Sequence, residues 1–329
     1  MNIDAESLSL SGVPIYLYGL SLSVAVAALL LLAAFLAKKQ GFQKGTVLLL
    51  GVIALPLGLF FARLFYCLIS MGYFLETISQ PVVMLYFWDG GLSMMGALMG
   101  GALAAWIVAK RMHIPYGKMM DVVAAAAGLF LAVARLGEKF TFLGRGKTIL
   151  SDWMAKSLFF GIQSAWGDEI YYAVYRYEAV AALLILCAML ALFFGKKTQR
   201  TARPGDLCWV FVVLFGASQV IFESLRDDGH LLWGFVRASQ VISILGPVAA
   251  IAVFSTRIAR VKGMNWMLPG GWAVAAGSIA LAVVKEFDID TSNNLTREYI
   301  IMALAMASLA AVAMLLWKKQ KAATLDTGA

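Results

Sequence analysis

The feature that most limits how this chain can fold is a series of long apolar stretches, each separated from the next by a short polar segment. Nine of them reach roughly 17–25 residues, the length that a helix needs to cross the hydrocarbon core of a bilayer. They cover about residues 15–37, 45–71, 91–109, 119–136, 177–195, 207–225, 234–256, 269–285 and 299–317. With 61% hydrophobic residues, the chain is too apolar for a soluble domain. The sequence predicts an all-α, polytopic helical membrane protein.

The polar segments alternate in charge along the chain. Every second segment carries a cluster of cations, namely Lys38, Lys39 and Lys44; Lys110, Arg111 and Lys118; Lys196, Lys197, Arg200 and Arg203; Arg257, Arg260 and Lys262; and Lys318, Lys319 and Lys321. The remaining segments carry acids such as Glu76, Asp227 and Glu286. Because cytoplasmic loops are enriched in Lys and Arg, we expect the N-terminus outside and the C-terminus in the cytoplasm. The aromatic-rich connection 137–176 is then an external segment, lying on the membrane or forming a small head.

Composition excludes several kinds of chemistry. The three cysteines, Cys67, Cys187 and Cys208, each lie inside an apolar run, so neither a disulfide framework nor a metal-ligand spacing is expected. Only two histidines occur. The net charge of +8 is explained by the cationic clusters beside the membrane, so nucleic acid is not expected as a partner. No cofactor is expected.

Two glycine patterns invite a functional reading, and neither supports one. Gly96 and Gly100 have the spacing that lets two helices pack closely. Gly146-Lys147-Thr148 resembles the end of a phosphate-binding loop, but Thr141 stands where the first glycine of such a loop belongs. The first pattern predicts close helix packing, and the second is coincidental.

Ionisable residues gather where the apolar stretches meet the predicted outer face. Gln219, Glu223 and Arg226 share one helix face at i, i+4 and i+7, and Arg135 and Glu138 are three residues apart, so the two groups can converge. Guanidinium groups bind phosphate through two parallel hydrogen bonds. The pattern favours a site for an anionic lipid headgroup in the outer leaflet. The alternative is that these side chains pair with one another or extend to the interface.

Six segments also carry recognisable motifs in order over about residues 12–258. They are Ile15-Tyr16-Leu17-Tyr18-Gly19; Ala62-Arg63-Leu64-Phe65-Tyr66; the glycine-rich run 90–101; Arg135-Leu136-Gly137 followed by Gly146, after Asp121; Tyr177-Glu178-Ala179; and Arg203-Pro204-Gly205 followed by Glu223 and Arg226. Together they resemble the prolipoprotein diacylglyceryl transferase family of the bacterial cytoplasmic (inner) membrane. The resemblance implies transfer of the diacylglyceryl group of phosphatidylglycerol to the lipobox cysteine of a prolipoprotein at the outer leaflet, without a cofactor or metal.

The resemblance also implies which residues form the site. Matched positions give the catalytic set Arg135, Glu138, Glu223 and Arg226, and the substrate-binding set Tyr18, Arg63, Gly91, Met95, Gly146, Tyr177, Glu178 and Gln219. It implies a seven-helix core over residues 1–262, and residues 263–329 then add about two further helices and a short cytoplasmic tail.

Four features depart from the family pattern. Met95 occupies the position of a histidine, Glu138 that of an asparagine and Gln219 that of an arginine, and the last two helices are additional. His230 is the remaining histidine predicted to lie outside. Alternative hypotheses are a relative with a changed lipid donor or acceptor, a lipid-binding homologue without catalysis, and a transporter. A transporter predicts ionisable residues throughout the membrane depth, whereas here most lie near the outer face.

Overall fold

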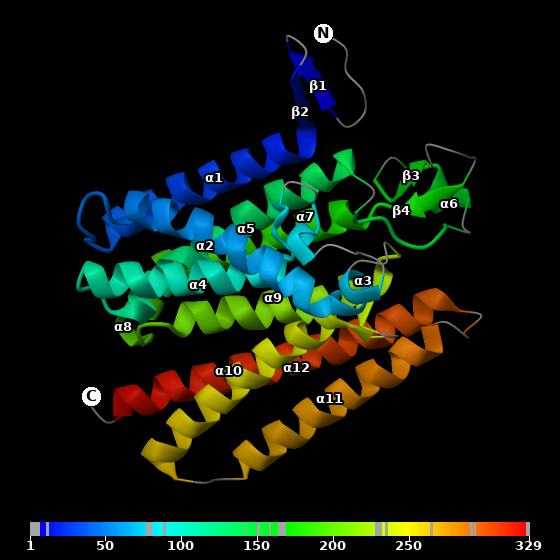
Figure 1. Cartoon of the computed structure of the whole chain (residues 1–329). Coiled ribbons are helices and arrows are strands. Elements are labelled where there is room, and N and C mark those ends of the chain that lie inside the picture. The colour runs from blue at the N-terminus through cyan, green and yellow to red at the C-terminus, as the bar shows by residue number, and fades with distance from the viewer. Residues whose placement is uncertain are drawn as a thin grey trace.

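The fold is known from a computed structural model, which describes residues 7–10, 13–76, 81–87, 90–141, 143–149, 152–157, 159–163, 169–227, 232–233, 236–263, 266–289, 292 and 294–326. Its main feature is a bundle of long helices that run side by side (Figure 1). In chain order these are α1 (Leu17–Lys39), α2 (Thr46–Ile69), α4 (Met94–Arg111), α5 (Tyr116–Gly137), α7 (Val174–Phe194), α9 (Asp206–Leu225), α10 (Ala238–Lys262), α11 (Met267–Ile289) and α12 (Leu295–Asp326).

Shorter elements connect the long helices. They are α3 (Met71–Glu76), α6 (Asp152–Ala155), α8 (Lys196–Thr201) and the 3-10 turns η1 (Pro81–Leu85) and η3 (Glu138–Phe140). Three antiparallel strand pairs join β1 (Ser7–Leu10) to β2 (Val13–Tyr16), β3 (Gly161–Gln163) to β4 (Ile170–Tyr172), and β5 (Leu232–Trp233) to β6 (Val236–Arg237). The predicted external connection therefore contains a small β-hairpin.

Each of the nine predicted stretches forms one of the long helices. Among the described residues, eight helices have the length and apolarity to cross a membrane, so the chain is a multi-pass membrane protein. The ninth, α4, is 18 residues long, contains three glycines, ends in Lys110 and Arg111, and is not one of these eight. Eight of the nine expected helices thus meet this criterion in the described part of the chain, and α4 packs along α2.

The two ends of the bundle differ in character. The pairs β1–β2 and β3–β4, with α6, lie at one end, and the end of α12 and helix α8 lie at the other (Figure 1). The predicted cationic clusters, such as Lys38 with Lys39 and Lys110 with Arg111, fall at the C-terminal ends of helices that run toward α8. We call the end with the strands the strand end and the opposite one the cationic end.

The contact between α2 and α4 depends on glycines. A Cβ atom placed on Gly96 would lie 2.8 Å from the Cα atom of Ala62, and one on Gly100 would lie 2.8 Å from the Cα atom of Gly58. Real Cβ atoms do not approach other atoms so closely, so only glycine lets these backbones pack at this distance. The close packing predicted from the spacing of Gly96 and Gly100 is confirmed.

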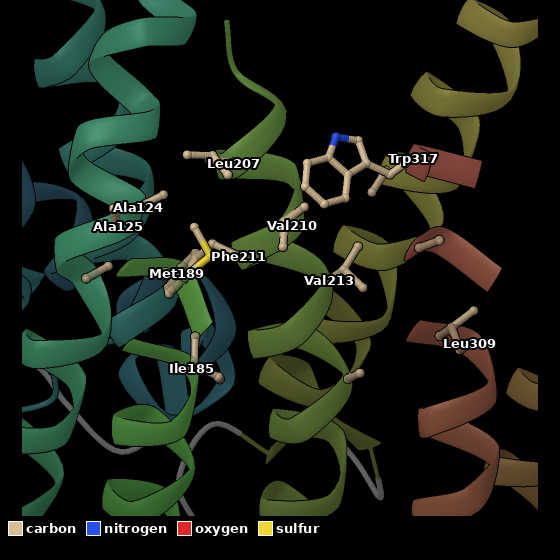
Figure 2. Close-up of a cluster of buried hydrophobic side chains, with 14 of the residues drawn as sticks. Ala124, Ala125, Ile185, Met189, Leu207, Val210, Phe211, Val213, Leu309 and Trp317 are labelled. Atoms are coloured by element: carbon tan, nitrogen blue, oxygen red, sulfur yellow. The ribbon is translucent and has the colours of Figure 1, made fainter. Parts of the chain in front are cut away.

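One apolar core runs through most of the bundle. It includes Ala125 of α5, Met189 of α7, Val210 of α9 and Leu309 of α12. Figure 2 shows side chains from these four helices pointing into the same cluster. The additional C-terminal helices are therefore packed into the same core as the helices that resemble the transferase family.

Candidate functional site

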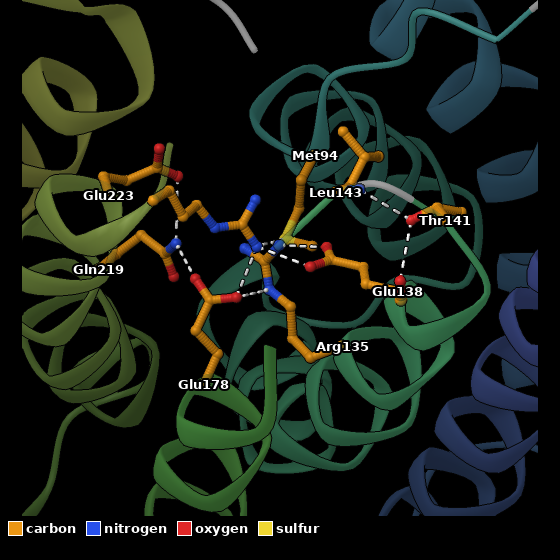
Figure 3. A network of polar contacts seen from close by, with 9 residues as sticks. Met94, Arg135, Glu138, Thr141, Leu143, Glu178, Gln219 and Glu223 are labelled. Atoms are coloured by element: carbon orange, nitrogen blue, oxygen red, sulfur yellow. Dashed lines mark hydrogen bonds and ion pairs between the residues drawn. The ribbon is translucent and has the colours of Figure 1, made fainter. Parts of the chain in front are cut away.

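Buried charged side chains from three helices meet near the strand end of the bundle (Figure 3). Arg135, in the last turn of α5, donates from Nη1 to Oε1 of Glu138 at 2.5 Å, and its Nε lies 3.0 Å from Oε2 of Glu178 on α7. Nη2 of Arg226, at the end of α9, lies 2.7 Å from Oε2 of Glu138 and 2.6 Å from Oε2 of Glu178. We call these four residues, with Gln219 and Glu223, the outer cluster.

Glu138 connects the two arginines. Its Oε1 accepts from Arg135 and its Oε2 from Arg226, so this one carboxylate joins the end of α5 to the end of α9. Glu178 joins the same two arginines from α7. No residue of the outer cluster is more than 7% exposed, so these ion pairs lie out of water, where electrostatic interactions are strong.

The outer cluster contains more acidic than basic groups. Gln219 donates from Nε2 to Oε1 of Glu178 at 2.9 Å and to Oε1 of Glu223 at 3.2 Å, so a neutral amide lies between two carboxylates. Counted formally, Glu138, Glu178 and Glu223 with Arg135 and Arg226 carry a net charge of −1. A neutral amide in place of Glu138 would bring this net charge to zero. An arginine in place of Gln219, in addition to that amide, would make the cluster positive.

A small pocket lies directly beneath the outer cluster, between α5, α7 and α9. Its polar side is formed by Arg135, Glu178 and Gln219, and its apolar side includes Leu131, Ile185 and Phe215. The pocket therefore borders the ion pairs of the outer cluster on one side and apolar side chains of the bundle on the other.

Glycines let the backbone approach the outer cluster. A Cβ atom on Gly146 would lie 2.7 Å from the carbonyl oxygen of Leu225, and Gly146 pairs with Arg226 as an isolated antiparallel bridge. Gly144 has a φ of +70°, and a Cβ atom there would lie 2.9 Å from Cβ of Tyr175. The segment after η3 therefore closes over the cluster, with Gly146 holding it against the end of α9.

Tyr18 lies beside this closed segment. A Cβ atom on Gly137 would lie 3.6 Å from Cδ2 of Tyr18 and 2.8 Å from Cβ of Ser21, so the first turns of α1 pack against the end of α5. The ring of Tyr18 therefore lies beside Gly137, the residue that precedes Glu138.

Arg63 makes a different set of contacts from the other predicted arginines. Its guanidinium donates to four backbone carbonyls, those of Val83 at 2.8 Å, Met84 at 2.9 Å, Gly90 at 2.5 Å and Gly91 at 3.2 Å. It therefore fixes the connection between α2 and α4. These bonds use four of its five N–H groups, so a phosphate contact through two hydrogen bonds would require Arg63 to give up one of them.

The connection that Arg63 fixes leads directly to the outer cluster. Gly91 has a φ of +65°, and a Cβ atom there would lie 2.8 Å from Nη1 of Arg63. Three residues later, the sulfur of Met94 accepts from Nη2 of Arg135 at 3.7 Å. The neighbouring Met95 is buried in the first turn of α4. The start of α4 is thus held by Arg63 on one side and contacts Arg135 on the other.

Tyr177 points toward the connection between α5 and α7. Its hydroxyl donates to the carbonyl of Phe160 at 2.6 Å, and its ring packs against those of Phe159 and Phe160. Glu178, the next residue along α7, points into the outer cluster. The pair Tyr177-Glu178 therefore links the β3–β4 hairpin to the cluster.

Sequence reasoning missed some of the residues that shape the cluster. Met94 is apolar, so its sequence position did not indicate a contact with Arg135. No local pattern predicted the left-handed backbone conformation of Gly144. Arg237 also contributes, because it donates from Nη2 to the carbonyl of Arg226 at 2.7 Å. His230, the predicted external histidine, lies outside the described residues.

Fold and site together define a class, a multi-pass helical membrane protein with buried arginine–glutamate pairs above a pocket that is polar at one end and apolar at the other. Residues 6–256 match the family model described as prolipoprotein diacylglyceryl transferase. The chain belongs to this family and is a transferase. The expected family is confirmed, and α11 and α12 lie beyond the matched residues.

Several curated proteins are similar to the chain over the same region. The phosphatidylglycerol–prolipoprotein diacylglyceryl transferase of Clostridioides difficile is 29% identical over 249 residues, 76% of this chain and 93% of the relative. The proteins of that name from Halalkalibacterium halodurans and Nostoc are 25% and 26% identical, covering 80% and 77% of this chain and 88% of each relative.

Proposed function

We propose that this chain transfers the diacylglyceryl group of phosphatidylglycerol to the thiol of a lipobox cysteine in a prolipoprotein. The observation that carries the proposal is the convergence of Arg135 and Arg226, from the ends of two helices, on the shared carboxylates of Glu138 and Glu178. The names of the similar proteins state the same donor and acceptor.

The reaction is a substitution at carbon. The cysteine sulfur, as thiolate, attacks the diacylglyceryl carbon that is bonded to the phosphate oxygen. A sulfur–carbon bond forms, the carbon–oxygen bond breaks, and the electron pair leaves with the oxygen as glycerol 1-phosphate. The thiol proton is released. Negative charge therefore moves from the sulfur to the phosphate group, and the leaving group is where a cation helps most.

Arg135 and Arg226 suit the role of holding that phosphate. Guanidinium groups remain charged at all relevant pH values and match phosphate oxygens with paired N–H groups. Glu138 and Glu178 accept the hydrogen bonds of these arginines. Lipid binding is then an exchange, in which phosphate oxygens replace carboxylate oxygens on one or both guanidiniums.

The predicted topology supports a site in the outer leaflet. The outer cluster lies at the strand end, opposite the cationic ends of α1 and α4. Lys and Arg gather on the cytoplasmic side of membrane proteins. On this basis the chain lies in the bacterial cytoplasmic membrane with its N-terminus, the β3–β4 hairpin and the cluster facing outward, where Tyr18 and Gly146 line the site.

A second candidate is transfer from a donor whose headgroup also carries a positive charge. The specific observation is Glu138, a third carboxylate that gives the outer cluster its formal net charge of −1. A zwitterionic headgroup could place its cation against Glu138 or Glu223 while its phosphate meets Arg135. Such a relative would keep the reaction and change the lipid.

The test is a transfer assay with purified chain in liposomes and a lipobox peptide, read by the mass of the peptide. Liposomes contain phosphatidylglycerol or phosphatidylethanolamine as the only phospholipid. The proposal expects the peptide to gain a diacylglyceryl group from phosphatidylglycerol, and Arg135→Ala to abolish that gain. Transfer from phosphatidylethanolamine alone would favour the second candidate.

Variants that restore the family residues separate loss of catalysis from a change of donor. Met95→His and Gln219→Arg return a histidine and an arginine to positions where the family has them. If the native chain is inert with both lipids while these variants transfer from phosphatidylglycerol, the proposed function is wrong for the native chain. It would then be a lipid-binding homologue.

A further inference from the structure

We infer that the additional helices α11 and α12 position the catalytic end of α9, with Tyr299 as the positioning residue that caps that end. The inference rests on the proposed function for its effect on transfer, and it concerns residues beyond the family match, which ends at residue 256. Four observations carry it: a helix-end hydrogen bond, the anchoring of Tyr299, a second link through α10, and a matching contact at the other end of α9.

The first observation is the bond from Tyr299 to the end of α9. Helix α9 ends at Leu225, and the last four carbonyls of a helix lack partners within it. One of them, that of Phe222, accepts from the backbone N–H of Arg226 at 3.1 Å. Another, that of Ser224, accepts from the hydroxyl of Tyr299 at 3.1 Å. Ser224 directly follows Glu223 and stands two residues before Arg226.

The second observation is that Tyr299 is itself held in place. Its neighbour Glu298 is 1% exposed and lies 2.8 Å from Nζ of Lys285 on α11. Arg297 pairs with the other carboxylate oxygen of Glu298 at 2.6 Å. A buried carboxylate with cations on both oxygens fixes the first turn of α12 against the last turns of α11. The hydroxyl of Tyr299 is therefore held in place where α12 begins beside the end of α11.

The third observation is a link from α11 to α9 through α10. Gln240 of α10 donates from Nε2 to Oε2 of Glu286 on α11 at 3.0 Å and to the carbonyl of Val220 on α9 at 3.4 Å. Val220 follows Gln219, the amide of the outer cluster. The side chain of Gln240 thus connects the added helices to α9 one turn below the bond made by Tyr299.

The fourth observation lies at the cationic end, where the same helix α12 grips the start of α9. Asp206, which is fully buried, accepts from Nε1 of Trp317 at 3.1 Å and from Nε2 of Gln320 at 3.3 Å. Between the two ends, Leu309 of α12 shares the apolar core with Val213 of α9 (Figure 2). Helix α12 therefore holds α9 at both ends and along its length.

The consequence for the site is geometric. Glu223 and Arg226 come from α9, whereas Arg135 and Glu178 come from α5 and α7. A small shift of α9 along its axis would change every distance between these pairs, and positioning errors of about 1 Å can reduce a rate by about 10²-fold. The added helices fix the axial position of α9. Their role in the transferase is thus to set the distance between its arginines.

The test compares Tyr299→Phe with Tyr116→Phe in the full chain. Each variant removes one tyrosine hydroxyl that donates to a backbone carbonyl, Tyr299 to Ser224 and Tyr116 to Ala102 near the cationic end. We expect Tyr299→Phe to lower kcat about three- to tenfold, the effect of losing one neutral hydrogen bond that holds reacting groups. KM for the lipid and the thermal midpoint should change little, and Tyr116→Phe should match the native chain in both.

A readout independent of transfer is hydrogen exchange of the backbone amides of Arg226 and Asp227, which bond to the carbonyls of Phe222 and Arg145. Tyr299→Phe should speed their exchange at least about threefold, and Tyr116→Phe should not. If the native chain transfers no lipid but exchange changes as expected, positioning holds and the proposed function fails. Unchanged exchange in Tyr299→Phe, or equal effects of the two variants, overturns the inference.

A double variant separates positioning from general stability. If Tyr299 acts through Arg226, the loss in kcat for Tyr299→Phe should be much smaller in an Arg226→Lys background, because the arginine it positions is already altered. Equal losses in the two backgrounds would contradict the inference.

Discussion

The two ends of α9 each carry a cluster of charged and amide side chains, and the clusters differ in composition. At the cationic end, the single carboxylate of Asp206 meets Arg257 at 2.7 Å, the ring N–H of Trp317 and the amide of Gln320. We call this the inner cluster. At the strand end, three carboxylates share two guanidiniums and one amide. In the inner cluster, several donor side chains share one carboxylate. In the outer cluster, the carboxylates outnumber the guanidiniums.

The difference shows why a buried ion pair alone is weak evidence for a site. The inner cluster joins α9 to α10 and α12, and all its described partners belong to the scaffold. The outer cluster lies above a pocket, and its carboxylates occupy arginine N–H groups that a phosphate could take over. On the proposed function, the inner cluster serves stability and the outer one serves ligand exchange, and the four predictions below test that division.

The largest effect is expected from Asp206→Ala in the inner cluster. This change leaves Arg257, Trp317 and Gln320 without their shared acceptor, and removing one partner of a buried pair lowers the free energy of unfolding by about 3–5 kcal/mol. Thermal and denaturant unfolding in detergent would measure it, with Asp206→Asn as the matched control that keeps the shape and one acceptor. A loss below about 1 kcal/mol would show that the inner cluster does not hold the helices together.

The next largest effect is on transfer, from Arg226→Ala in the outer cluster. Removing one group that stabilises developing charge lowers a rate by about 10²–10³-fold. We expect that loss in kcat/KM for phosphatidylglycerol, measured by peptide mass and corrected for folded protein. Arg111→Ala, in the last turn of α4 at the cationic end, is the control. Equal activity of Arg226→Ala and the native chain would remove this arginine from the site.

An intermediate effect is expected from Gly96→Ala, which tests whether the close packing of α4 on α2 supports the outer cluster. The added methyl group would push α4 from α2 and move Met94 away from Arg135, and overpacking costs about 1–3 kcal/mol of stability. Gly101→Ala on the same helix is the control, since a Cβ atom there meets nothing within 4 Å. If both changes are neutral, the close packing of α2 and α4 does not contribute.

The smallest effect is expected from Glu138→Asn, which gives the outer cluster the neutral amide of the family. The formal charge of the cluster rises from −1 to zero, and N–H groups of Arg135 and Arg226 become available. We expect KM for phosphatidylglycerol to fall about three- to tenfold, the effect of about one charged hydrogen bond. A rise in KM would show that Glu138 contributes to binding the donor and would favour a headgroup with a cation.

Much of this architecture followed from the sequence. Apolar length predicted each long helix because a membrane helix must satisfy its own backbone within one segment. Helix-face spacing predicted that Gln219, Glu223 and Arg226 would face the end of α5, and the structure joins Arg226 to Glu138 at 2.7 Å. The glycine spacing predicted the close packing of α2 and α4. These signals are local, so they can be read from one stretch of chain.

Other features depend on contacts between distant segments, and no local pattern encodes them. The sequence did not predict that Arg63 would donate to four carbonyls of a connection 20 to 28 residues later, and its binding of phosphate stays a prediction. The bond from Tyr299 to Ser224 spans 75 residues. The roles of the predicted site residues in catalysis remain predictions, because sequence and fold place side chains without showing which of them meets the reacting atoms.

The most direct test is transfer per folded molecule in two matched variants, Arg135→Lys and Arg257→Lys. Both arginines pair with a buried glutamate or aspartate, Arg135 in the outer cluster and Arg257 in the inner one. Lysine keeps the charge of each and removes the fork that binds phosphate through two hydrogen bonds. We predict that Arg135→Lys loses most of its transfer to the lipobox peptide and that Arg257→Lys keeps it. Equal transfer by both variants would contradict the assignment of the chemistry to the outer cluster.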